Sequence, residues 1–173
     1  NHDLRAGKYG EELWQSHFGP SWYSFDVGNV HYVVTPMLGG DHAPSYRRSD
    51  IIRWLKNDLA QTDKGKRIVL FNHDLWFWGD DLLFKDKNGE QIDFADYNLD
   101  AMIYGHWHNH YYKQLKSGLH TYCSSTPDKG GIDHGTSCFR IYNADTKGKL
   151  SSATRYTYID GILTSAYPAE GET

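Results

Sequence analysis

Three histidines lie at alternating positions in DAMIYGHWHNHYY, residues 100–112. His106, His108 and His110 follow a short apolar run, and Gly105 stands directly before the first of them. One interpretation is a strand with a polar face, because side chains alternate across a strand. A second is a set of buried histidines with satisfied hydrogen bonds. A third is a metal site, since the glycine lets the backbone turn and an H-x-H pair presents nitrogen ligands suited to Zn, Fe or Mn.

Two other places carry residues of similar chemistry. His73 follows the apolar run IVLF, and Asn1, His2 and Asp3 open the chain. Taken singly, each pattern is weak, because a histidine can simply follow a strand. His17 is expected at the C-terminal end of a helix, where a cation is favourable. Surface or loop positions are expected for the others, His31, His42, His120 and His134.

The segments before these histidines predict elements that would bring them together. Residues 64–74 and 100–108 each contain a short apolar run typical of a strand buried on both faces, and each run leads into histidine. Residues 50–61 place apolar side chains on one face at helical spacing, with Ser49 as the expected N-cap. In mixed α/β folds ligands gather beyond the carboxyl ends of strands, so the histidines are expected at one rim.

The rest of the chain predicts further short elements. Residues 8–18 favour a helix that Gly19 and Pro20 stop, residues 22–37 a hairpin turning at Gly28, and residues 92–97 a short helix after a turn at Asn88 and Gly89. Strands are expected at 110–115, 119–125, 136–143 and 151–159, with turns at 117–118, 129–131 and 145–148. The pattern indicates a mixed α/β protein with packed sheets and outer helices. We expect one domain over residues 1–160 and a C-terminal tail over 161–173.

Composition narrows the class of protein. The chain has 173 residues, 15% of them aromatic and 23% charged, which suits a folded single domain and excludes a disordered segment. A net charge of -4 without a Lys/Arg run argues against a nucleic-acid partner. The longest apolar run is about five residues against the ~20 of a membrane span. Cys123 and Cys138 could pair or stay free, and their spacing does not decide.

The order of the candidate residues along the chain resembles the order of the motifs in one protein family. Asn1, His2 and Asp3, then a lone His73 after a strand, then the G-H-x-H of residues 105–108, are similar to the later motifs of the calcineurin-like metallophosphoesterases, which include the purple acid phosphatases. In that family the blocks run D-x-H, G-D-x-x-D, G-N-H-[D/E], a lone His and G-H-x-H. The resemblance covers nearly all of the chain. It implies a mixed β-sandwich flanked by helices in four layers, incomplete at the N-terminus because the first two blocks are missing.

The resemblance also implies roles for these residues. Asn1, through its amide oxygen, His73 and His106 would bind one metal, and His108 would bind a second with ligands from the missing portion. Two divalent or mixed-valence transition metal ions (Fe, Mn or Zn) would neutralise the phosphoryl oxygens and hold a bridging hydroxide as nucleophile. His2 would be a catalytic residue beside the leaving oxygen and not a ligand. Asp3 would either orient His2 or act as a charge near a helix N-terminus.

The implied function is metal-dependent hydrolysis of phosphate mono- or diesters, with this chain inactive on its own. Its implied partners are a phosphate ester and the missing N-terminal portion, and relatives suggest a periplasmic or secreted location. One alternative is a non-catalytic scaffold or regulatory module with at most one weakly bound metal. Another is a single-metal β-protein that reached His73 and the H-x-H pair by convergence. The side chains expected either to wall the site or simply to pack are Trp76, Trp78, Trp107 and His110; the loop 124–135 is expected either to face the site or to connect strands.

Overall fold

A six-stranded mixed sheet forms the centre of the molecule. The structure, a computed structural model, describes residues 1–4, 10–40, 43–126, 137–157 and 163–167. The strand order is β1-β2-β3-β6-β8-β7, in which β2, β3, β6 and β8 are mutually parallel and the two edge strands are antiparallel to their neighbours. The strands are β1 (Tyr23–Val27), β2 (Val30–Val34), β3 (Arg67–Phe71), β6 (Leu99–Tyr104), β7 (Tyr111–Gln114) and β8 (His120–Cys123).

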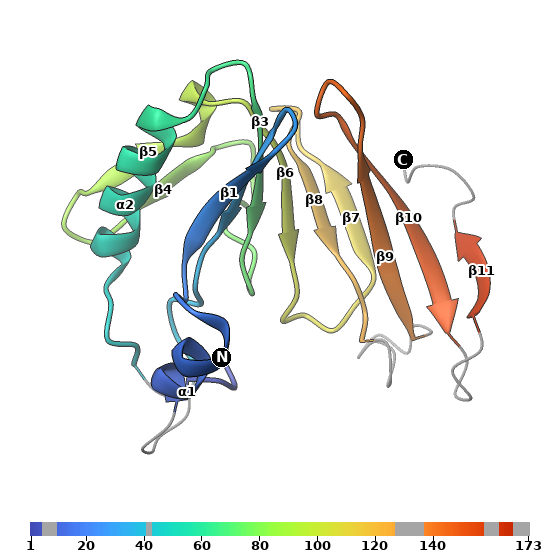
Figure 1. The fold of residues 1–173 in the computed structure, drawn as a ribbon, viewed down its shortest axis with the longest axis horizontal. Helices are drawn as coiled ribbons and strands as arrows, with labels where there is room; N and C mark the ends of the chain where they lie inside the picture. Colours follow the sequence, from blue (N-terminus) through green and yellow to red (C-terminus); the bar gives the residue numbers. More distant parts are fainter. Residues whose placement is uncertain (5–9, 41–42, 127–136, 158–162, 168–173) are drawn as a thin grey trace.

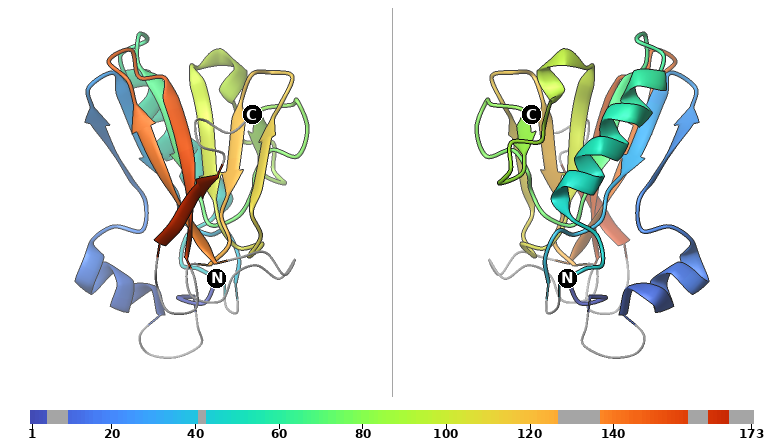
Figure 2. Two further views of the ribbon diagram at one scale, coloured as in Figure 1. Left: turned by 90° about the vertical axis from the view of Figure 1, so that its right-hand side faces the viewer. Right: turned by 90° about the vertical axis from the view of Figure 1, so that its left-hand side faces the viewer.

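Different elements cover the two faces of this sheet. On one side lie helix α2 (Arg48–Gln61) and the hairpin of β4 (Leu83–Lys85) and β5 (Gln91–Asp93). On the other lies a three-stranded antiparallel sheet of β9 (Cys138–Ala144), β10 (Leu150–Thr157) and β11 (Leu163–Tyr167). Figure 1 shows these layers side by side, and Figure 2 shows the molecule from the second sheet and from α2. The expected class, mixed α/β with packed sheets and a helix outside, is confirmed.

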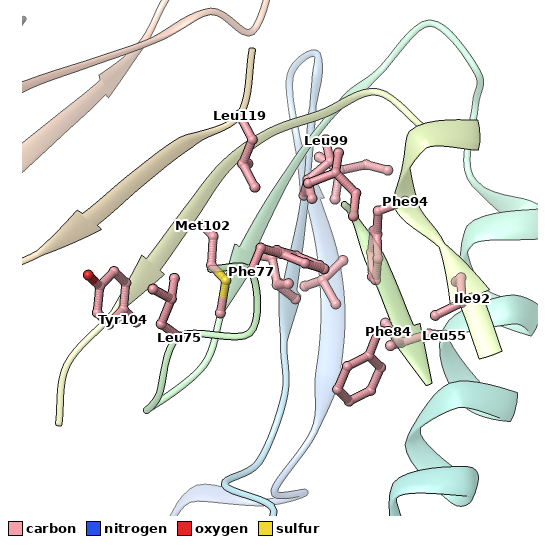
Figure 3. Packing of buried hydrophobic residues seen from close by; sticks show 14 of the residues in the cluster. Leu55, Leu75, Phe77, Phe84, Ile92, Phe94, Leu99, Met102, Tyr104 and Leu119 are labelled. Carbon is pink, nitrogen blue, oxygen red and sulfur yellow. The ribbon is translucent and has the colours of Figure 1, made fainter. Parts of the chain in front are cut away.

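The main core lies between α2 and the central sheet. Apolar residues at helical spacing on α2 are buried against the sheet, as the pattern predicted. Figure 3 shows residues of this cluster, among them Leu55 of α2 near Phe84 and Ile92, with Met102 on the far side of Phe77. Burying one such side chain contributes about 1.5–3 kcal/mol. A smaller cluster under the second sheet joins Val30, Val69, Ala101, Tyr122 and Leu150.

Two helix predictions need correction. Helix α2 begins at Arg48 with Arg47 as its N-cap, and not with Ser49. The Asp50 carboxylate accepts a hydrogen bond of 2.8 Å from the Arg47 backbone N–H, which closes the first turn earlier. The short helix expected at 92–97 is present only as a 3₁₀ helix, η1 (Phe94–Asp96), because Ile92 belongs to β5.

His31 is also not a surface residue. It is buried in β2, and its two ring nitrogens lie 2.8 Å from an Asp26 oxygen and 2.9 Å from an Asp58 oxygen. Asp58 belongs to α2, so this histidine connects the helix to the β1–β2 hairpin. His120 is half-buried within β8, while His42 and His134 lie outside the described residues.

Most other expected elements are present. Helix α1 (Gly10–Phe18) is followed by Gly19, which has positive φ, and His17 lies in the last turn of the helix. The positive φ of Gly28 (55°) and Gly89 (90°) makes the β1–β2 and β4–β5 turns, and further glycines turn β7–β8 and β9–β10. Strand β11 falls within the expected tail, where it pairs with β10. The turn expected at 129–131 lies outside the described residues.

The two cysteines, Cys123 and Cys138, are free and buried. None of the helices in the described part of the chain is long and apolar enough to cross a membrane.

Candidate metal site

The two histidine loops leave neighbouring parallel strands at the same end of the sheet. Strands β3 and β6 pair in parallel, and their hydrogen bonding continues past both strands: Asn72 N–H donates to Ile103 O (3.2 Å) and Gly105 N–H to His73 O (3.1 Å). His73 therefore lies directly beside Gly105. The rings of His73 and His106 face each other edge to face, with centroids 5.1 Å apart. The expectation that these two histidines meet at one rim is confirmed.

Asn1, the first residue of the sequence, also lies beside His73. Its Oδ1 lies 2.8 Å from Nε2 of His73. Figure 1 shows the N-terminus at the end of the molecule toward which β3 and β6 point. The backbone of Asn1 is in close contact with Gly40, where an added Cβ would lie 2.8 Å from the Asn1 carbonyl oxygen. An amide oxygen and two imidazoles thus converge from three separate segments.

The backbone around the H-x-H pair has an uncommon conformation. His106 has φ 64° and His108 has φ 50°, whereas every other described residue with positive φ is a glycine. Trp107 N–H donates to Gly105 O at 2.7 Å, so His106 stands at the centre of a tight three-residue turn. Positive φ at such residues costs of order 1–3 kcal/mol, and strain of this kind clusters at functional sites.

The charge state of His73 suits a ligand. Burial, helped by the nearby His106, lowers the pKa of His73 from 6.5 to about 4. Its imidazole is therefore neutral at physiological pH, which is the form that binds metals. Among the described residues, no three His, Cys, Asp or Glu side chains gather closely enough to form a metal site. The converging set instead joins two imidazoles to an amide, a donor set that fits a borderline transition metal.

The remaining expected site residues lie around this set. His2 and Asp3 are exposed and, with Asn1 and His73, line a cavity of about 370 Å³. His108 is exposed, two residues beyond His106 in the same loop. Within the described part of the chain, no hydrogen bond or ring contact joins His108 to His73 or His106.

Asn72 holds the His73 loop and was not singled out from the sequence as a site residue. It is buried, and its amide nitrogen donates to Thr35 Oγ1 (2.9 Å) and Pro36 O (2.9 Å) at the end of β2. Its Oδ1 accepts from the Asp74 backbone N–H at 2.9 Å. The side chain thereby ties the carboxyl ends of β2 and β3 together and shapes the turn at His73. The signal in the sequence that could have identified Asn72 is its position as a polar residue directly after the apolar run IVLF.

The aromatic residues near the site divide between packing and exposure. Trp76 stacks on Phe84 with centroids 3.8 Å apart, so it packs inward. Trp78 is 69% exposed and touches Trp107, whose ring also contacts Tyr104. Trp107 directly follows His106 in the sequence, and Trp78 and Trp76 both line a separate cavity with Asp74.

His110, the third histidine of the alternating run, turns toward the second sheet. Its Nδ1 lies 3.7 Å from Cys138 Sγ, and its Nε2 lies 3.3 Å from a guanidinium nitrogen of Arg140. His110 therefore packs against the second sheet, while His106 lies beside His73. The loop 124–135 was expected either to face the site or to connect strands, and its residues 127–135 lie outside the described residues.

Comparisons with known proteins find similarity at low sequence identity, among solved structures. No family model matches the chain, and no curated protein matches it. Among solved structures, it is similar to purple acid phosphatase PPD1 from yellow lupin (Lupinus luteus) seeds, with 16% identity, a TM-score of 0.48, and coverage of 84% of this chain and 32% of that one. It is also similar to Vps29 from Entamoeba histolytica, solved with Zn²⁺, with 11% identity, a TM-score of 0.40, and coverage of 94% and 78%. The chain thus spans about a third of the length of the phosphatase.

Proposed function

We propose that the chain carries part of the metal site of a phosphate ester hydrolase, in which Asn1, His73 and His106 bind one transition metal ion. The observation that supports this proposal is the convergence of these three side chains: 2.8 Å from Asn1 Oδ1 to His73 Nε2, and 5.1 Å between the two imidazole centroids. Their order along the chain matches the order in which the metallophosphoesterase motifs supply the same ligand types.

Each of the candidate site residues has its own task in this proposal. A bound metal pair supplies Lewis-acid neutralisation of the phosphoryl oxygens. His73 and His106 would hold one ion through nitrogen and Asn1 would do so through its amide oxygen, while His108 would bind a second ion whose other ligands come from outside the chain. His2 lies close enough to His73 to influence its charge, and the two line one cavity. In this proposal the exposed imidazole of His2 donates a proton to the leaving oxygen.

The test compares metal content with turnover in the full protein that contains this chain. We expect His106→Ala to remove metal and activity together, and His2→Ala to keep the metal but lower the hydrolysis of p-nitrophenyl phosphate by about 10²–10⁴-fold. His17→Ala, at an exposed helix end, is the matched control and should change neither. Elemental analysis gives the metal content. Hydrolysis by a metal-free preparation, or full metal content in His106→Ala, would end the proposal; metal binding without hydrolysis would favour the scaffold alternative.

A further inference from the structure

A hydrogen bond between two side chains connects the two histidine loops. The indole Nε1–H of Trp107 donates to Oδ1 of Asp74 at 3.1 Å. Trp107 directly follows His106, and Asp74 directly follows His73. The bond therefore joins the immediate neighbours of the two proposed imidazole ligands.

Asp74 is itself held firmly at its end of this bond. Its Oδ1 also accepts from the Leu75 backbone N–H at 2.8 Å, and its own N–H donates to Asn72 Oδ1 at 2.9 Å. Asn72 in turn is fixed to the end of β2. The carboxylate is thus anchored to the sheet, and a hydrogen bond to such a charged acceptor is stronger than one between neutral groups.

The loop on the other side begins where the strand pairing ends. Beyond the Gly105 N–H, the ladder between β3 and β6 ends, and His106 itself is exposed. The chain there holds a positive φ that a non-glycine residue adopts only when its surroundings enforce it. The Trp107 ring, packed against Tyr104 at a centroid distance of 5.2 Å, provides a rigid arm from this turn to Asp74.

We propose that Asp74 and Trp107 are positioning residues, which set the orientation of the His106 imidazole relative to His73 and so determine the metal affinity of the site. This inference rests on the proposed function, because it assigns these residues a task only if the two histidines share a metal. Partners that orient metal-binding residues are typically worth 10–100-fold in affinity.

The experiment titrates the chain with Co²⁺ and follows its visible absorption, which reports both the dissociation constant and the coordination geometry. Trp107→Phe removes the N–H donor and keeps an aromatic ring, while Asp74→Ala removes the acceptor. We expect each to weaken Co²⁺ binding by about 10–100-fold with an altered spectrum, and the double variant to be no weaker than the worse single one. Asp74→Asn keeps an oxygen acceptor and should recover most of the affinity.

Two variants are matched controls. Trp78→Phe alters the exposed neighbour of Trp107, and Asp81→Ala removes another carboxylate that caps the same segment through the Leu83 N–H. Both should bind Co²⁺ like the wild type. Thermal unfolding of each variant without metal shows whether the fold is intact.

The outcomes separate the two proposals. If His106→Ala abolishes Co²⁺ binding while Trp107→Phe and Asp74→Ala bind with unchanged affinity and spectrum, the positioning role is wrong and the metal site stands. A lower melting temperature in those two variants with an unchanged spectrum would also overturn the positioning role. If His73→Ala and His106→Ala themselves leave Co²⁺ binding unchanged, the proposed function fails, and the positioning role fails with it.

Discussion

Substituting Gly40 tests whether the position of Asn1 matters. A Cβ on residue 40 would lie 2.8 Å from the Asn1 carbonyl oxygen, 3.0 Å from its Cα and 3.2 Å from Leu4 Cβ. Ordinary contacts begin at 3.4 Å, so in Gly40→Ala the Asn1 backbone must move by about 0.6 Å. Metal–ligand distances tolerate only about 0.2 Å, which makes this displacement large for a ligand.

The expected result is a loss of metal affinity larger than the loss of fold stability. We expect Gly40→Ala to weaken metal binding by at least about tenfold, which is about 1.4 kcal/mol. The free energy of unfolding should fall by about 1 kcal/mol, at the low end for overpacking, because Asn1 and the Leu4 turn can shift together. That change corresponds to about 2–4 °C in melting temperature for a chain of this length. Isothermal titration with Zn²⁺ and thermal unfolding without metal measure the two quantities.

The neighbouring Gly39 supplies a matched control. A Cβ at Gly39 meets nothing within 4 Å, so Gly39→Ala should bind metal like the wild type and be unchanged or slightly stabilised. Equal metal affinity in Gly40→Ala and Gly39→Ala would refute the reasoning, because it would mean that Asn1 can move without consequence for the site.

Three further predictions concern the fold. Phe94→Ala, which opens a cavity at a side chain with no exposed surface, should lower the free energy of unfolding by about 3–5 kcal/mol in denaturant titration, and a loss below 1 kcal/mol would contradict the packing described. His31→Leu should cost about 2–4 kcal/mol because it leaves the Asp58 carboxylate without its imidazole partner, whereas exposed His17→Leu should cost under about 1 kcal/mol in the same assay. Burial holds the pKa of His120 below 6.5, so protonation favours the unfolded chain and stability is lost as pH falls below 6.5. His120→Gln should reduce that slope in pH-dependent melting, and the rest of the slope comes from groups such as His73, whose pKa burial also lowers. An unchanged slope would mean that His120 does not contribute to it.

The sequence alone was informative where one pattern decides one element. The apolar runs before His73 and Gly105 predicted two buried strands with histidine beyond their carboxyl ends, and β3 and β6 are those strands. Parallel pairing then follows from their shared burial. The face of α2 was equally predictable, because four apolar side chains recur at helical spacing.

Features that depend on partners far along the chain could not be predicted. His31 was assigned to the surface because nothing near it in sequence shows that Asp58, 27 residues away, completes its hydrogen bonds. The bond between Trp107 and Asp74 spans 33 residues and has no periodic signature. The start of α2 was misplaced because Ser49 is a good N-cap by type, whereas the reach of the Asp50 carboxylate to Arg47 decides the boundary.

The parallel pairing of β3 and β6 has a consequence for how the site can vary. Neighbouring strands lie about 4.8 Å apart, and Gly105 is hydrogen-bonded to His73, so the sheet sets the spacing of the backbone from which the two histidines project. The β4–β5 hairpin, which lies between β3 and β6 along the chain, contributes little to that spacing. Insertions at the tip of the β4–β5 hairpin, around Gly89, should therefore leave the histidine separation intact, and chains of quite different length can share this pair.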